Sequence, residues 1–204
     1  MARHLLVWDA PNVDMTLANI IEGKPTAKER PDLAVLGNWL VSRAAEDDEV
    51  EACVFVNVAS HVAGPMRGWV LWLLEQGFRV FAKPKVADSD VDDDMIEHLW
   101  ERFEEGDLET VYVGSNDARA FLDPLAQLAD EGVHTSVLGF AEFAGGLSTA
   151  DHVDFIDLES IEGLFADALP RLTLELLPTD GRWFEPRGRL GAGTGGRLHS
   201  PDPA

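Results

Sequence analysis

Acidic side chains follow apolar segments of this chain at the point where each segment ends. Asp9 closes the apolar run that starts at His4, and Asn12 stands three residues further on. Asp117 follows the apolar run that ends at Val113 in a similar way. Carboxylate oxygens are ligands for hard cations such as Mg²⁺ and Mn²⁺, which in turn bind phosphate groups. These residues are therefore candidates for a metal or phosphate site.

A third acidic group is the run over residues 88–94, DSDVDDD, which leads directly into a predicted helix. Most carboxylates in such a run form a solvated face or are favoured by the dipole at a helix start. A site needs only one or two of them. The helical pattern favours Asp94, followed by Asp92. The choice among the candidates stays open at this point; they are Asp90, Asp92, Asp93 and Asp94.

The elements that position these residues alternate between strands and helices. Strands are predicted at about residues 4–9, 51–58, 78–82, 110–113, 134–138 and 153–158. Helices are predicted at about 31–45, 64–76, 95–103, 118–131 and 159–169, with an irregular polar connection over 13–30. The alternation predicts an α/β fold, a doubly wound and mostly parallel sheet of five or six strands flanked by helices. The strand ends then share one edge, and the first and fourth strands are expected to be neighbours.

Carboxylates that converge at one edge repel one another. Two of them about 4 Å apart repel by about 4 kcal/mol at an effective dielectric constant near 20. Three or four would cost much of the net stability of a domain, about 5–15 kcal/mol. The cluster is therefore sensible only around a cation, and all-oxygen ligation indicates Mg²⁺ or Mn²⁺ as the cofactor. The expected ligands and catalytic groups are Asp9, Asp92, Asp94 and Asp117.

A hard metal held by carboxylates suits phosphodiester hydrolysis, because it polarises the phosphoryl oxygen and lowers the pKa of an attacking water. We expect Asn12 and Ser115 to orient a metal-bound water or a phosphate. Basic residues at the same rim are expected to guide a polyanionic backbone through an otherwise negative surface. They are Lys83, Lys85 and Arg119.

Three motifs resemble those of the NYN domain, a branch of the PIN-like metal-dependent nucleases. They are VWDAPN (7–12), the Asp-rich segment after the third strand, and VGSND (113–117), all within about residues 4–160. The residues that match the family pattern are Asp9 and Asn12, Asp92 with Asp94 as its neighbour, and Ser115 with Asp117. The resemblance implies a PIN-like fold, Mg²⁺ or Mn²⁺ as cofactor, and the cleavage of RNA.

One position departs from that family pattern. Arg119 stands where the family has a second Asp in its third motif, so one ligand is lost or replaced. Asp151 and Asp154, which follow the fifth strand, are the candidates to supply it. The departure favours an alternative function, in which the chain is a non-catalytic PIN-like module that binds RNA or protein.

The charge of the chain also bears on function. The 204 residues include 37 Asp and Glu against 16 Lys and Arg, a formal net charge of -21. Such a surface repels nucleic acid unless a metal or a local basic patch reverses the field. A third choice is a haloacid-dehalogenase-like phosphatase, which also begins with an apolar strand ending in Asp. That chemistry needs an acid two residues later, where Pro11 stands.

Residues 1–169 are predicted to form the NYN/PIN-like domain, and 170–204 a C-terminal extension. The extension is expected to contain one short strand over 172–176 and to be disordered from about 186. No apolar run reaches the length of a membrane span, and the single Cys53 lies in an apolar strand, so we expect a cytoplasmic protein without membrane contact. Homodimerisation stays open.

An aromatic stripe at helical spacing lies within residues 64–76. Trp69, Trp72 and Leu73 belong to it. Such a stripe is far more often part of a core than a surface for stacking bases, so we expect these side chains to be packed.

Overall fold

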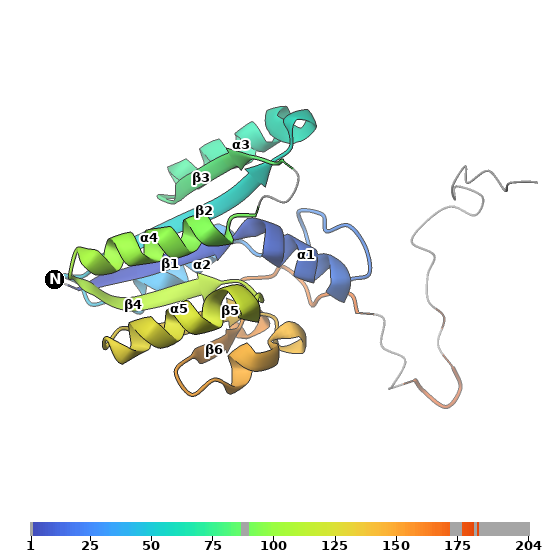
Figure 1. The fold of residues 1–204 in the computed structure, drawn as a ribbon. Coiled ribbons are helices and arrows are strands. Elements are labelled where there is room, and N and C mark those ends of the chain that lie inside the picture. Colours follow the sequence, from blue (N-terminus) through green and yellow to red (C-terminus); the bar gives the residue numbers. More distant parts are fainter. Residues whose placement is uncertain (1, 87–89, 172–176, 182, 184–204) are drawn as a thin grey trace, which may run out of the picture. The chain divides into compact units, whose positions relative to one another are not determined.

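The computed structural model describes residues 2–86, 90–171, 177–181 and 183 (Figure 1). The chain divides into two units, Met1–Arg171 and Leu172–Ala204, and the elements below belong to the first. The predicted strand over 172–176 and the predicted disorder from about 186 fall outside the described residues. No helix in the described part of the chain is long and apolar enough to cross a membrane.

Six parallel strands form a single sheet in the structure (Figure 1). They are β1 (Arg3–Asp9), β2 (Glu49–Val58), β3 (Arg79–Pro84), β4 (Leu108–Gly114), β5 (His134–Gly139) and β6 (Asp154–Asp157). Their order is β3-β2-β1-β4-β5-β6, so the winding reverses between β1 and β4, which pair in parallel. This confirms the predicted doubly wound fold and the predicted neighbours. In such a fold a ligand site is expected at the carboxyl ends of β1 and β4.

Helices cover both faces of the sheet. They are α1 (Ala10–Ile20), α2 (Leu33–Val41), α3 (Ala63–Glu75), α4 (Asp92–Glu104) and α5 (Ala118–Asp130). Successive residues of β1 point to opposite faces, as the twofold repeat of a strand requires. Leu6 and Trp8 belong to the core on the side of α1, α2 and α3, whereas Leu5 and Val7 belong to the core under α4 and α5. Figure 1 shows α4 and α5 lying together over one face.

The expectation of an irregular connection over residues 13–30 is wrong in its first part, because α1 begins immediately after Asp9. The Asp9 side chain caps the helix, and Pro11 lies in its first turn. Val13, Leu17 and Ile20 are buried at helical spacing against the sheet. Burial of this apolar face and the cap at Asp9 together favour a helix over the polar character of the segment.

The predicted helix over 159–169 is also wrong. Its beginning forms only a short 3₁₀ helix (Leu158–Ser160), and Gly163 has a positive φ of 76° that an α-helix does not allow. Leu158, Ile161 and Leu164 are nevertheless buried in the core on the α1 side. The apolar spacing in this segment therefore reports burial rather than helical structure.

Candidate functional site

Asp9 lies at the junction of β1 and α1, and only 3% of its surface is exposed. One carboxylate oxygen accepts a hydrogen bond from the backbone N–H of Asn12 at 3.0 Å. The other accepts a hydrogen bond from the Ser115 hydroxyl, just beyond β4, at 3.3 Å. Asp9 is thus both a helix cap and a group held in place by the neighbouring strand.

Side-chain amides join the ends of β1, β4 and β5. The Asn12 side-chain oxygen accepts a hydrogen bond from the backbone N–H of Asn116 at 2.9 Å. The Asn116 side chain in turn donates to the carbonyl of Phe140 and accepts from its N–H, both at 3.0 Å. Gly139 gives it room, since a Cβ there would lie 2.9 Å from the Asn116 Nδ2. This network fixes the loop that carries Ser115.

Asp117 caps α5. Its side chain accepts hydrogen bonds from the backbone N–H groups of Arg119 and Ala120, at 2.9 and 3.3 Å. Its own N–H donates to the Ser115 hydroxyl at 3.1 Å. Ser115 therefore links Asp9 and Asp117, and both aspartates line the same pocket.

Asp92 is the first residue of α4 and brings a third carboxyl group to this point. Burial raises the pKa of Asp9 to about 7. The hydrogen bond from the Asn12 N–H lowers this pKa, and the charge of Asp92 raises it. Burial and the charges of Asp90 and Asp117 raise the pKa of Asp92 to about 6. A hydrogen-bond interaction between the two carboxyl groups raises the pKa of Asp9 further and lowers that of Asp92. Raised carboxyl pKa values of this kind mark buried groups and concentrated negative charge.

The donor types of this cluster are those of a hard-cation site, but in the described structure the ligand oxygens of its three carboxylates do not all lie within 4.8 Å of one another. Asp9, Asp92 and Asp117 offer only carboxylate oxygens, the ligands preferred by Mg²⁺ and Mn²⁺. Burial is the largest cause of the raised pKa values of Asp9 and Asp92, and the charges of neighbouring carboxylates add to it.

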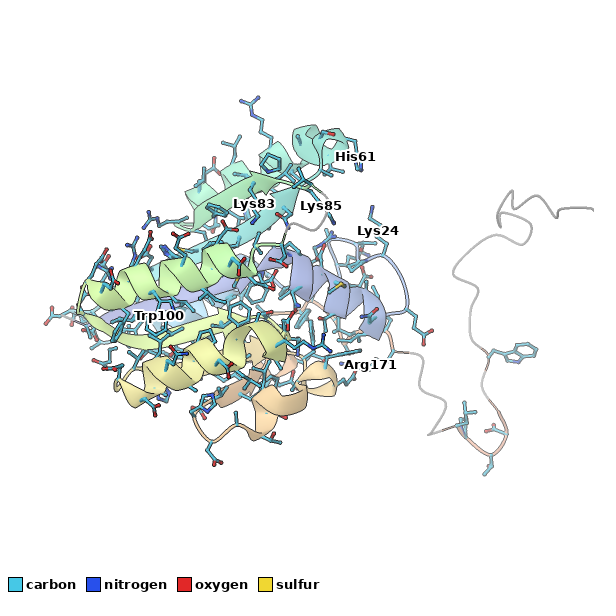
Figure 2. The ribbon with its side chains drawn as sticks, viewed as in Figure 1. Lys24, His61, Lys83, Lys85, Trp100 and Arg171 are labelled. Atoms are coloured by element: carbon cyan, nitrogen blue, oxygen red, sulfur yellow. The ribbon has the colours of Figure 1, made fainter. Side chains whose placement is uncertain are left out.

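The three carboxylates line a large pocket of about 1230 Å³. Basic residues line it from two other segments, Lys28 and Arg30 in the connection between α1 and α2 and Lys85 just after β3. Figure 2 shows Lys85 at the same end of the molecule as Lys24. Apolar residues of α3 and of the turn before it complete the wall. Cations and an apolar wall therefore surround the acidic site.

The structure does not bring all the predicted site residues together. Asp94, the carboxylate favoured by the helical pattern, lies two residues after Asp92 in the first turn of α4 and forms an ion pair with Lys83 of β3. Arg119 is exposed on the first turn of α5. Asp94, Lys83 and Arg119 are not among the described residues that line the pocket, whereas Asn12 and Lys85 are.

The proposed replacements for the missing acidic residue lie at the wrong edge of the sheet. Asp154 is the first residue of β6, pairs with Ser136 in register, and its carboxylate is 3.6 Å from His134 Nε2 at the start of β5. Asp151 precedes that strand and is exposed. In a parallel sheet the amino ends lie opposite the carboxyl ends where Asp9 is found, so neither residue can complete the site.

Two features of the pocket were missed by the sequence reasoning. Trp69 and Trp72 are only partly buried: each packs against the core and also lines the pocket, while Leu73 is fully buried as expected. Asp14 binds Arg30 through both carboxylate oxygens, at 2.8 and 2.7 Å, and so ties the connection after α1 to that helix. The helical spacing of the tryptophans could not reveal that α3 borders a pocket.

A second group of metal-ligand types lies under α4. Cys53 Sγ is 3.4 Å from His98 Nε2 and 3.5 Å from a Glu51 oxygen, which itself is 3.5 Å from His98 Nε2. Although burial raises the pKa of Glu51, the Arg102 and Arg79 guanidiniums outweigh it and lower that pKa to about 2. Burial and the Glu51 charge raise the pKa of the Cys53 thiol to about 12. A protonated thiol and a carboxylate already bound by two guanidiniums are poor metal ligands, so this cluster ranks below the pocket.

Comparisons with known proteins support the fold alone. No family model matches this chain, and no curated protein does. Among solved structures, the chain is similar to a protein of unknown function from Vibrio parahaemolyticus, with a TM-score of 0.58 and 19% sequence identity. The match covers 76% of this chain and 93% of that one. It therefore extends over nearly the whole of a second protein with this α/β architecture.

Proposed function

We propose that this protein is a metal-dependent ribonuclease that hydrolyses RNA phosphodiester bonds. The observation that carries the proposal is that Asp9, Asp92 and Asp117, from the carboxyl ends of β1 and β4 and the start of α4, line one pocket of about 1230 Å³. The pKa values of two of these groups are raised, as expected for carboxylates gathered to bind a cation. The assignment to RNA rests on the resemblance of the three motifs to the NYN domain.

In this proposal Asp9, Asp92 and Asp117 hold Mg²⁺ or Mn²⁺. Such an ion, when bound, polarises a phosphoryl oxygen and lowers the pKa of a water molecule. The chain itself supplies the orientation of the ligands. The N–H of Asn12 and the hydroxyl of Ser115 hold the two oxygens of Asp9, so this carboxylate is positioned before the ion arrives.

Substrate phosphates would be bound by the cations of the pocket wall. Lys85 approaches from the end of β3, and Lys28 from the connection after α1. They form the local basic patch that a chain with a net charge of -21 needs in order to bind a polyanion. The three carboxylates and these lysines give the pocket the opposite charges that bind a metal and a phosphate together.

A cleavage assay with a labelled single-stranded RNA tests the proposal. We expect cleavage by the wild-type chain in Mn²⁺, none in EDTA, and at least a 100-fold lower rate for Asp92→Asn. Asp94→Asn is the matched control on the same helix turn, since Asp94 is bound to Lys83 rather than exposed to the pocket, and it should retain activity within a few-fold. Absence of cleavage by the wild-type chain in both Mn²⁺ and Mg²⁺ would overturn the proposal.

The second candidate is a non-catalytic PIN-like module that binds RNA or a protein. The observation in its favour is that Arg119 stands where the NYN motif has an Asp. Asp151 and Asp154 lie at the opposite edge of the sheet and cannot replace that Asp. Such a module would bind RNA without cleaving it. The same assay separates the two functions when uncut RNA is also examined for binding.

A further inference from the structure

The pocket is larger than a metal ion and a phosphate group require. Its volume of about 1230 Å³ exceeds the roughly 300–1,000 Å³ of ordinary small-molecule sites. The acidic cluster and the lysines account for the polar part of its lining. Much of the remaining lining is apolar, and one stretch of it lies on α3 and the turn before it.

This apolar wall is built by one side of α3 and the turn that precedes it. Val62, Met66 and Trp69 follow one another at spacings of four and three residues, which places them on one helix face, and Trp72 continues it. All four line the pocket and all four are partly exposed. A partly exposed Trp in a pocket offers part of its aromatic ring to a ligand while the rest stays packed against the core.

Basic groups lie in the same pocket as this wall. Lys85 follows β3, and Lys28 belongs to the connection between α1 and α2. Arg30 also lines the pocket, although Asp14 binds its guanidinium through both oxygens. The pocket thus combines an aromatic wall, cations and a carboxylate cluster.

We infer that the α3 wall is a subsite for an unpaired nucleobase of the substrate, which stacks on Trp69. This inference rests on the proposed function, which it deepens by making the substrate single-stranded at this position. A nucleotide offers a group for each kind of lining residue: a base for the indole, and phosphates for Lys28 or Lys85 and for a metal at the carboxylates. An acyl chain or an apolar peptide side chain would match the apolar wall alone.

Stacking on Trp69 requires the base to be unpaired. A base within a duplex already stacks on its neighbours and is covered on both faces, so it cannot lie against the indole without being extruded. Aromatic stacking of this kind accepts any base, because every base has a flat face. The subsite therefore selects for single strands rather than for a particular sequence.

Binding measured in EDTA tests the inference without any dependence on the metal site. The probe is a short fluorescein-labelled single-stranded RNA, titrated with protein and followed by anisotropy. We expect Trp69→Leu to bind about 10- to 100-fold more weakly than wild type, and Trp69→Phe, which keeps a ring, to bind within about threefold of it. The control is Trp100→Leu on α4, which removes a half-buried tryptophan outside the pocket and should bind as wild type (Figure 2).

Three further measurements keep the test decisive. Melting curves show whether each variant is folded, and Met66→Glu replaces a second part of the wall with a charge that repels phosphate, so it should also weaken binding at least tenfold. A duplex of the same sequence should bind wild type more weakly and be insensitive to Trp69. Wild-type affinity in a folded Trp69→Leu or Met66→Glu variant overturns the inference, as does equal binding of duplex and single strand. A chain that stacks RNA on Trp69 but fails to cleave it in Mn²⁺ or Mg²⁺ overturns only the proposed function.

Discussion

Replacement of the buried carboxylate at the centre of the site should stabilise the metal-free protein. In Asp9→Asn the side chain keeps its shape, and its oxygen can still accept the hydrogen bond from the Asn12 N–H. Its amide group can donate to Asp92, so a hydrogen bond replaces the repulsion between the two carboxylates. The variant therefore removes a buried charge without opening a cavity, and its cost is the loss of the Asp9 oxygen that accepts from the Ser115 hydroxyl.

The size of the effect follows from the pKa of Asp9. A rise from 3.8 to about 7 means that ionised Asp9 destabilises the fold at pH 8 by up to about 4 kcal/mol, at 1.36 kcal/mol for each pKa unit. Neutralising Asp9 also removes its repulsion of Asp92, whereas the loss of charge weakens the hydrogen bond from the Asn12 N–H. We expect a net gain of about 2 kcal/mol in the free energy of unfolding. For a domain of this size that gain raises Tm by about 4–8 °C.

The sign of the pH dependence provides a second test. The pKa is raised in the folded state, so the folded chain binds more protons than the unfolded chain between about pH 4 and pH 7. The contribution of Asp9 to stability therefore falls as pH rises through this range. The advantage of Asp9→Asn should grow from about 1 kcal/mol or less near pH 4.5 to its full size at pH 8.

Thermal melts in EDTA at pH 4.5 and pH 8 measure this difference. Asp123→Asn is the matched control, since Asp123 is exposed on α5 and the change should leave Tm within about 1 °C. An Asp9→Asn variant that melts at or below the wild-type Tm at pH 8 would refute the reasoning. It would mean that Asp9 is not strained in the folded chain.

The remaining predictions concern the rest of the fold. Glu51→Gln should destabilise the protein by about 2–3 kcal/mol at pH 7, because it leaves the buried side of Arg102 without its partner. Since the folded pKa of Glu51 is about 2, below its ordinary value, this difference should shrink in urea titrations as pH falls from about 5 towards 2. Gly139→Ala should lower stability by about 1–3 kcal/mol, because its Cβ meets an Asn116 side chain held on both sides. Gly68→Ala, in open space within α3, should instead gain about 0.5–1 kcal/mol in the same melts, and equal effects of the two changes would contradict this account.

The overall fold could be predicted because its signals are local and repeated. Each buried strand is an apolar run of suitable length, and helical segments separate the runs, so a parallel doubly wound sheet follows from connectivity. The convergence of Asp9 and Asp117 is a consequence of that topology, since β1 and β4 are neighbours. Such inferences need no knowledge of individual side-chain contacts.

The details that failed depend on tertiary contacts. Helix α1 was missed because its apolar face is narrow and it starts directly at a strand end, with Asp9 serving both elements. Asp94 was favoured over Asp92 because helical spacing does not show which face of α4 points to the pocket. The ion pair between Asp94 and Lys83 settles that orientation, and it joins residues on two different elements.

The partly exposed tryptophans illustrate the same limit of sequence patterns. A helical stripe predicts burial for Leu73, which is fully buried, and also for Trp69, which is buried on one side only. The difference depends on what lies opposite α3. That side is bordered by the connection after α1, whose position is set in part by the ion pair of Arg30 with Asp14.

Titration of Mn²⁺ by calorimetry tests the central claim most directly, that Asp9, Asp92 and Asp117 together form a divalent-metal site. We predict micromolar binding by the wild-type protein, loss of binding in Asp92→Asn and in Asp117→Asn, and unchanged binding in Asp94→Asn. Asn retains a capping side chain at position 117, so the loss there would not come from an unfolded α5. Absence of Mn²⁺ binding by the wild-type chain, or equal binding by the Asp92 and Asp94 variants, would contradict the account.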